Sequence, residues 1–127
     1  MPTKACNMSA NFIMLESLGE LDRVIERSHS EPVVLFKHSS TCGISGGVYR
    51  EVSEVTGDIN LVVVQTHREI SNAIAETTGI RHESPQAIIL WAGKPVYHAS
   101  HYDIISSDIQ DWMKPDQDKK KCAAGAC

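Results

Sequence analysis

The chain lacks the features that would place it in a membrane or on nucleic acid. Its 127 residues contain no apolar run near the roughly 18 residues that a membrane-spanning helix needs. The net charge is −4, and the only run of like charge is Lys119-Lys120-Lys121, so we expect neither a nucleic-acid partner nor a membrane partner. The first residues carry one lysine and no apolar core behind it, which does not fit a secretory signal. We therefore expect a cytoplasmic protein.

Cysteine is scarce, and no two cysteines have the Cys-x-x-Cys spacing of a dithiol or zinc site. The four are Cys6, Cys42, Cys122 and Cys127, and in a reducing compartment they are more often free or catalytic than structural. No two histidines have the i, i+4 spacing of a helical metal site, and no glycine-rich loop indicates a phosphate-bearing cofactor. We therefore predict no metal and no tightly bound cofactor, so that reducing equivalents arrive from outside.

Short apolar runs alternate with amphipathic stretches along the chain. Apolar runs bounded by turn residues predict strands, and apolar residues at helical spacing predict helices. The expected strands cover residues 11–15, 33–36, 61–64, 86–91 and 96–100, and the expected helices cover residues 16–29, a segment from Cys42 to Gly57, residues 68–78 and a segment from Ile105 to Pro115.

The order of these elements predicts an α/β protein with the thioredoxin topology. Two strand–helix–strand crossovers precede a hairpin and a final helix, and continuous apolar strands suit a sheet that helices cover on both faces. We expect a central mixed sheet flanked by helices in a thioredoxin-like domain over residues 11–114. Residues 1–10 are expected to form an N-terminal extension, and residues 115–127 a mobile tail that contains cysteine.

Cys42 follows an expected strand and stands where a helix should begin. Unpaired N–H groups and the positive end of the helix dipole stabilise an anion there, and they can lower a thiol pKa from about 8.5 into the range of about 3.5–7.5. The thiolate is the form that attacks a disulfide. We expect the hydroxyls of Thr41 and Ser45, with the helix start at Gly43 and Ile44, to support this thiolate. Because a hydroxyl cannot close a disulfide, a mixed disulfide on Cys42 needs another thiol for its release.

A simpler interpretation is that Cys42 is a small buried hydrophobic residue, as free cysteines often are. Its neighbours are serine, threonine and glycine, which is the composition of a loop and favours the redox interpretation. His38 lies nearby and either adds positive charge beside the thiol or is a solvated surface residue.

Ser84-Pro85 precedes the strand expected at residues 86–91. Proline donates nothing to a strand ladder, so its place before a central strand is unusual. Local sequence favours a trans bond, but the thioredoxin topology favours a cis bond that leaves the preceding backbone free to pair with an extended substrate.

Three stretches resemble the monothiol bacilliredoxins, the YtxJ-like branch of the thioredoxin superfamily. They are Lys37–Ser45, the specific run His82-Glu83-Ser84-Pro85-Gln86, and Ser100–Ile104, and the resemblance extends over about residues 11–113. It implies that Cys42 reduces mixed disulfides between protein thiols and bacillithiol or a similar small thiol, and that Ser84 and Pro85 bind the substrate. It also implies S-thiolated client proteins and an external thiol or disulfide reductase as partners.

Gly43 departs from that family, which usually has proline after the cysteine, and it leaves a second interpretation open. Cys42-Gly43-Ile44-Ser45 resembles the Cys-Gly-Phe-Ser motif of monothiol glutaredoxins, which carry a [2Fe–2S] cluster with thiolate ligands. Those proteins have a Thr-Val-Pro loop where this chain has Glu83-Ser84-Pro85. A cluster carrier is therefore the alternative function.

Cys122 and Cys127 lie in the expected tail, which also departs from the family. An extended chain spans at most about 3.3–3.6 Å per residue, so Cys127 can reach back across a domain of this size while Cys122 is near its limit. We expect Cys127 to attack a mixed disulfide on Cys42, and Cys122 then to close a disulfide within the tail. The alternative is a tail whose thiols have no such role, and we assign no role to Cys6.

Overall fold

The computed structural model describes residues 10–39 and 43–113 and has the predicted α/β architecture. The elements along the chain are β1 (Ala10–Met14), α2 (Leu18–Arg27), β2 (Val33–His38), α3 (Gly43–Val52), β3 (Gly57–Val63), α4 (Arg68–Thr78), β4 (Gln86–Trp91), β5 (Lys94–Ser100), the 3₁₀ turn η1 (His101–Asp103) and α5 (Ser106–Met113). None of the helices in these two described ranges is long and apolar enough to cross a bilayer.

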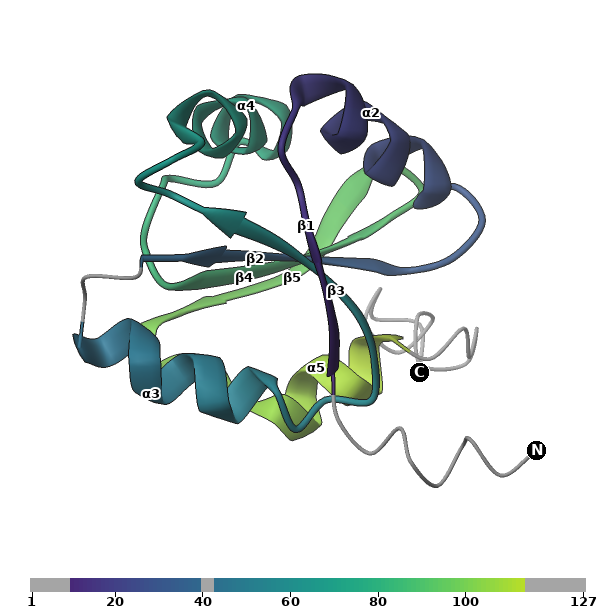
Figure 1. Cartoon of the computed structure of the whole chain (residues 1–127). Coiled ribbons are helices and arrows are strands. Elements are labelled where there is room, and N and C mark those ends of the chain that lie inside the picture. Colours follow the sequence, from purple (N-terminus) through teal and green to yellow (C-terminus); the bar gives the residue numbers. More distant parts are fainter. Residues whose placement is uncertain (1–9, 40–42, 114–127) are drawn as a thin grey trace.

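One mixed sheet of five strands forms the centre of the domain, in the order β1-β3-β2-β4-β5 (Figure 1). β1 and β2 run parallel to β3, whereas β4 runs antiparallel to β2 and to β5. A register shift interrupts the β4–β5 ladder between Ile89 and Leu90. The central mixed sheet that the sequence predicted is therefore confirmed.

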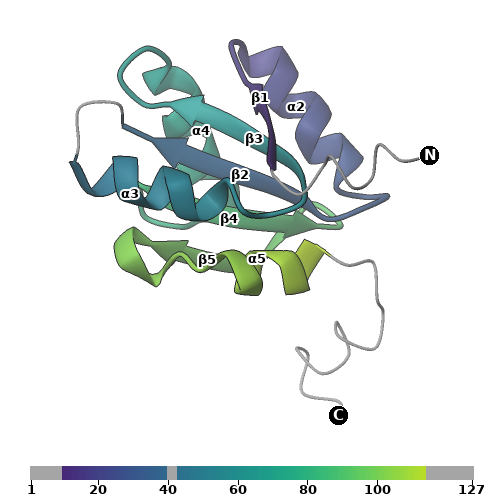
Figure 2. The same ribbon diagram turned by 60° about the horizontal axis from the view of Figure 1, so that its bottom comes forward.

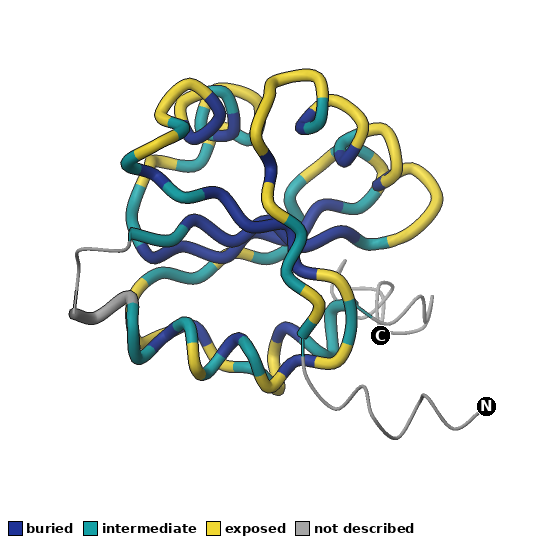
Figure 3. Tube along the Cα trace, viewed as in Figure 1, coloured by how far each residue is buried: buried dark blue, intermediate teal, exposed yellow. Residues whose placement is uncertain are grey.

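Helices cover both faces of the sheet, with α2 and α4 on one face and α3 and α5 on the other (Figures 1 and 2). Alternation along β2 explains why both layers are needed, because successive side chains of a strand point to opposite faces. Val34 and Phe36 pack in the core beneath α3 and α5, whereas Val33 and Leu35 pack in the core beneath α2 and α4. The central strands are accordingly buried along most of their length, and exposed residues concentrate on the outer sides of the helices (Figure 3).

The ends of α2 are fixed by serines. At its start the Ser17 hydroxyl accepts a hydrogen bond from the Glu20 N–H at 3.1 Å, which satisfies one of the free N–H groups of the first turn. At its end the Ser28 carbonyl and hydroxyl accept hydrogen bonds from the N–H groups of Ala92 and Gly93 at 2.7 and 2.9 Å. The turn between β4 and β5 is thereby tied to the end of α2.

The sequence placed the start of β3 too late. β3 begins at Gly57, four residues before the predicted apolar run, because the polar segment from Gly57 to Asn60 pairs with β1. The Asn11 amide donates to the Asp58 carboxylate at 2.9 Å, and the buried Asn60 amide donates to the Val34 carbonyl at 3.0 Å. These long-range partners compensate for the low apolar content on which the prediction relied.

Replacing Gly57 with alanine is expected to lower the free energy of unfolding by about 1–2 kcal/mol, because a side chain is strained at positive φ. Gly57 has φ +135°, and an added Cβ would lie 2.6 Å from the Met113 methyl group. Urea unfolding followed by circular dichroism measures the change. Gly47→Ala in α3 is the control, because its Cβ would meet nothing within 4 Å and alanine is the better helix former. Equal effects of the two substitutions would contradict the prediction.

Candidate active site

Two segments that the sequence singled out meet at one edge of the sheet. Lys37, near the end of β2, is paired in antiparallel register with Gln86, the first residue of β4. The chain after β2 leads to the start of α3, and Ser84 and Pro85 directly precede β4 (Figure 1). The end of β2, which precedes α3 in the chain, and the proline loop therefore lie side by side.

The predicted site residues divide into three groups. Ser84 and Pro85 are described in full. Gly43, Ile44 and Ser45 form the first turn of α3, as predicted, but their side chains lie outside the described part of the chain. The remaining predicted residues, which also lie outside the described residues, are Thr41, Cys42, Cys122 and Cys127.

The Ser84–Pro85 peptide bond is cis, as the topology predicted. Pro85 is buried, and its carbonyl accepts a hydrogen bond from the N–H of His101 at 3.0 Å. The Ser84 hydroxyl is buried and has no hydrogen-bond partner among the described residues. The loop thus enters β4 with one side held by the end of β5.

A partly buried polar contact, between a buried lysine and an exposed histidine, holds the inner side of this loop. Lys37 is fully buried, and its Nζ lies 3.1 Å from Nδ1 of His82. The Ser71 hydroxyl of α4 lies 3.1 Å from the same nitrogen. His82 therefore joins the proline loop to both β2 and α4.

Both titratable groups of this contact have altered pKa values. Burial lowers the pKa of Lys37 from 10.5 to about 8. Burial also lowers the pKa of His82, and the positive charges of Lys37 and Arg68 lower it further against an opposing effect of Glu83. At neutral pH we therefore expect a charged lysine beside a neutral imidazole.

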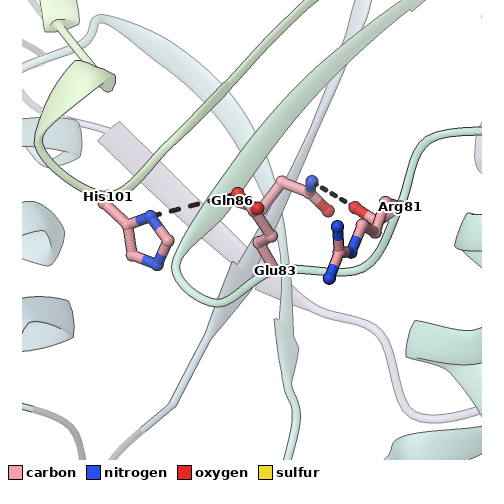
Figure 4. A network of polar contacts seen from close by, with 4 residues as sticks. All are labelled: Arg81, Glu83, Gln86 and His101. Carbon is pink, nitrogen blue, oxygen red and sulfur yellow. Dashed lines mark hydrogen bonds and ion pairs between the residues drawn. The ribbon is translucent and has the colours of Figure 1, made fainter.

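The outer side of the loop carries a second set of polar contacts (Figure 4). The Glu83 carboxylate lies 3.9 Å from Nδ1 of His101. A hydrogen bond from Ser100 lowers the pKa of Glu83, and the nearby positive charges act in the same direction. The Gln86 side-chain amide donates to the Arg81 carbonyl at 2.9 Å. These contacts fix the loop against β4 and the end of β5.

A cavity of about 280 Å³ lies beside this outer side of the loop. Its wall is mixed, with both polar and apolar groups, and the residues that line it are Gly79, Ile80, Arg81, Glu83, Gln86, His98 and Ser100. Within the described part of the chain, no group of three or more His, Cys, Asp or Glu side chains is placed to hold a metal ion.

His38 does not supply the positive charge that was considered for it. Its ring packs against Tyr49 of α3 with a centroid distance of 5.1 Å, and burial lowers its pKa. Its Nδ1 is buried and has no partner among the described residues. Since the pKa falls below 6.5, the imidazole is neutral at neutral pH.

A family model described as the monothiol bacilliredoxin BrxC matches residues 13–109. The chain belongs to the monothiol bacilliredoxin family. The match spans the whole sheet apart from the first residues of β1, and it includes both the entry to α3 and the cis-proline loop. The family resemblance that the sequence indicated is confirmed.

Solved structures place this bacilliredoxin in the thioredoxin fold. A protein described as a candidate oxidoreductase with a thioredoxin fold is 31% identical, with a TM-score of 0.73 over 81% of this chain and 94% of that one. Thioredoxin O2 from Arabidopsis thaliana matches 81% of this chain and 95% of its own with a TM-score of 0.65, at 17% identity. Schistosoma mansoni thioredoxin matches 81% of this chain and 95% of its own with a TM-score of 0.61, at 20% identity. The last two show the fold alone.

Sequence reasoning missed Lys37 and His82 as partners. Both stood within the stretches that carried the resemblance, but neither was given a role. Lysine is rarely fully buried, so its place in an apolar strand was the available signal. Lys37 directly follows Phe36 within β2, so an exposed position for its side chain was already open to question.

Proposed function

We propose that this bacilliredoxin removes bacillithiol, or a similar low-molecular-weight thiol, from protein mixed disulfides through Cys42. The observation that carries the proposal is that the end of β2, from which the chain continues to Cys42, lies beside the cis Ser84–Pro85 loop, in a chain that matches the family. S-thiolated proteins in the cytoplasm are the proposed clients.

The proposed reaction has two exchange steps. The Cys42 thiolate attacks the small-thiol sulfur of the mixed disulfide, and the client thiolate leaves and takes up a proton. Cys42 then carries the small thiol in a new disulfide. A second thiol from outside attacks that disulfide, supplies the two electrons and returns the Cys42 thiolate.

The start of α3 and the proline loop have different proposed roles in this reaction. The first N–H groups of α3, at Gly43, Ile44 and Ser45, together with Thr41, support the negative sulfur of Cys42. Ser84 and Pro85 align the substrate disulfide, because contacts on both sides of their loop restrict its movement.

Mass spectrometry after exposure to bacillithiol disulfide tests this function. The wild type is expected to gain one small-thiol adduct on Cys42, and Cys42→Ser is expected to lack it. A client protein that carries bacillithiol should lose it only in the presence of wild type. Adducts confined to Cys122 and Cys127 would overturn the assignment.

A [2Fe–2S] carrier is the competing function, because glycine follows Cys42 as in the monothiol glutaredoxin motif. Anaerobic reconstitution with iron, sulfide and a small thiol distinguishes the two. The oxidoreductase proposal predicts no visible cluster absorption, and stable bands that disappear in Cys42→Ser would favour the carrier.

We further propose that the tail resolves the adduct on Cys42. Met113, the last described residue before the tail, lines a cavity with Pro32, Val33 and Gly57, at the starts of β2 and β3. This is the end of the sheet opposite His38 (Figure 1). Thirteen extended residues from Lys114 to Cys127 span about 45 Å, which is more than the length of β2 at about 3.3 Å per residue.

Removing the residues after Pro115 is expected to slow turnover several-fold when the small thiol is limiting, without slowing adduct formation on Cys42. Client reduction and adduct lifetime measure the two steps separately. Cys127→Ser should reproduce the truncation, whereas Cys122→Ser should leave a disulfide between Cys42 and Cys127. Unchanged turnover in the truncated chain would exclude the resolving role.

A further inference from the structure

Lys37 is a buried cation without a buried anion. Its side chain is 0% exposed, and no carboxylate in the described part of the chain forms an ion pair with it. Burial of an unpaired charge opposes folding, and the lowered pKa of Lys37 is the expected consequence. An apolar side chain of similar length would fill the same space without this penalty, so the ammonium requires another explanation.

The only side chain that its Nζ contacts among the described residues is His82. An ammonium group has three donors and no acceptor, so Nδ1 of His82 must accept and its proton must be on Nε2. The charged groups that alter the pKa of His82 come from three parts of the chain: Lys37 of β2, Arg68 of α4, and Glu83 of its own loop. The contact therefore fixes the tautomer and the place of the imidazole together.

His82 stands three residues before the cis proline. The outer contacts hold the loop at the Arg81 carbonyl, at Glu83 and at the carbonyl of Pro85. The His82 side chain provides the contacts to the inner side, to β2 and α4. Without Lys37, the Ser71 hydroxyl would be the remaining partner of Nδ1 on that side.

We propose that Lys37 is a positioning residue whose ammonium holds His82 and thereby fixes the loop of residues 81–85 that presents Ser84 and Pro85 to the substrate disulfide. The part that concerns substrate rests on the proposed function. The part that concerns the loop does not, because it can be measured without any substrate.

Hydrogen exchange read by mass spectrometry on the full chain is the decisive experiment. In Lys37→Met the His101 amide, which donates to the Pro85 carbonyl, is expected to exchange at least tenfold faster, whereas the core strands should exchange no faster than in the wild type. His82→Leu should give the same result, whereas His82→Asn should stay near wild type because its oxygen can replace Nδ1 as acceptor. Lys94→Met, which removes an exposed lysine of β5, is the matched control and should change nothing.

Activity provides the second readout. Lys37→Met should lower kcat/KM for a small-thiol mixed disulfide about tenfold, mainly through KM. The rate at which iodoacetamide alkylates Cys42 should stay within twofold of the wild-type rate at every pH at which the two are compared. The Lys37→Met/His82→Leu double variant should be no worse than either single variant, because both remove one contact.

Unchanged exchange of the His101 amide in Lys37→Met would overturn the proposal. Faster exchange throughout the chain, in step with a loss of global stability, would also overturn it by showing a purely structural role. If the wild type reduces no mixed disulfide, the proposed function fails, while the exchange data still decide what Lys37 does.

Discussion

Lys37→Met is expected to raise the free energy of unfolding at pH 7 by about 3 kcal/mol. The folded protein holds this lysine at a pKa of about 8, against 10.5 for an unperturbed lysine, and each pKa unit corresponds to about 1.4 kcal/mol. Methionine removes the buried charge and keeps most of the apolar length of the side chain. A substitution that stabilises the fold while it weakens the reaction is the signature of a residue kept for function.

The pH dependence of this difference has a definite sign. Below pH 8 both the folded and unfolded states hold the proton, so the wild type carries the full penalty. Between pH 8 and 10.5 the unfolded state binds more protons than the folded state, so wild-type stability rises with pH. The advantage of Lys37→Met should therefore shrink towards zero as the pH approaches 10.5.

Urea unfolding of both proteins at several values between pH 7 and 10.5 measures this dependence. Lys94→Met is again the control, since an exposed lysine has no comparable penalty to lose. A difference between wild type and Lys37→Met that stays constant over this range would show that the lysine is not desolvated in the folded protein.

In a chain that lacks the residues after Pro115, Ser45→Cys is expected to shorten the lifetime of a small-thiol adduct on Cys42 at least a hundredfold. The substitution places a second thiol three residues after Cys42, in the first turn of α3. This thiol can attack the Cys42 sulfur, expel the small thiol and close a disulfide. An intramolecular thiol has an effective concentration far above that of a dilute external thiol.

Stopped reactions analysed by mass spectrometry give the adduct lifetime and the new disulfide directly. Ser45→Ala in the same truncated chain is the matched control and should keep the long-lived adduct. An adduct that persists in Ser45→Cys would mean that residues 42 and 45 cannot approach as a redox pair does, and it would weaken the proposed site.

The elements of the fold could be predicted from local pattern wherever apolar residues mark them. β4 at Gln86–Trp91 and α4 at Arg68–Thr78 have the predicted bounds. β3 was placed too late because pairing with β1, not apolar content, forms its first half. Such pairing joins segments more than 40 residues apart, and no local pattern contains it.

The cis-proline loop was predictable, but its internal contacts were not. The cis bond before Pro85 followed from the topology. The Lys37–His82 contact did not, because lysine in a sequence ordinarily indicates an exposed position and its partner lies 45 residues away. The roles of Cys42 and the tail cysteines remain predictions.

The two outer strands of the sheet have a consequence for aggregation. An open strand edge can pair with a strand of another polypeptide chain. β1 is only five residues long, and β5 begins with Lys94 and Pro95 beside an irregular ladder. A short edge, a lysine, a proline and a bulge each discourage strand addition, so polymerisation through added strands is opposed at both sides of the sheet.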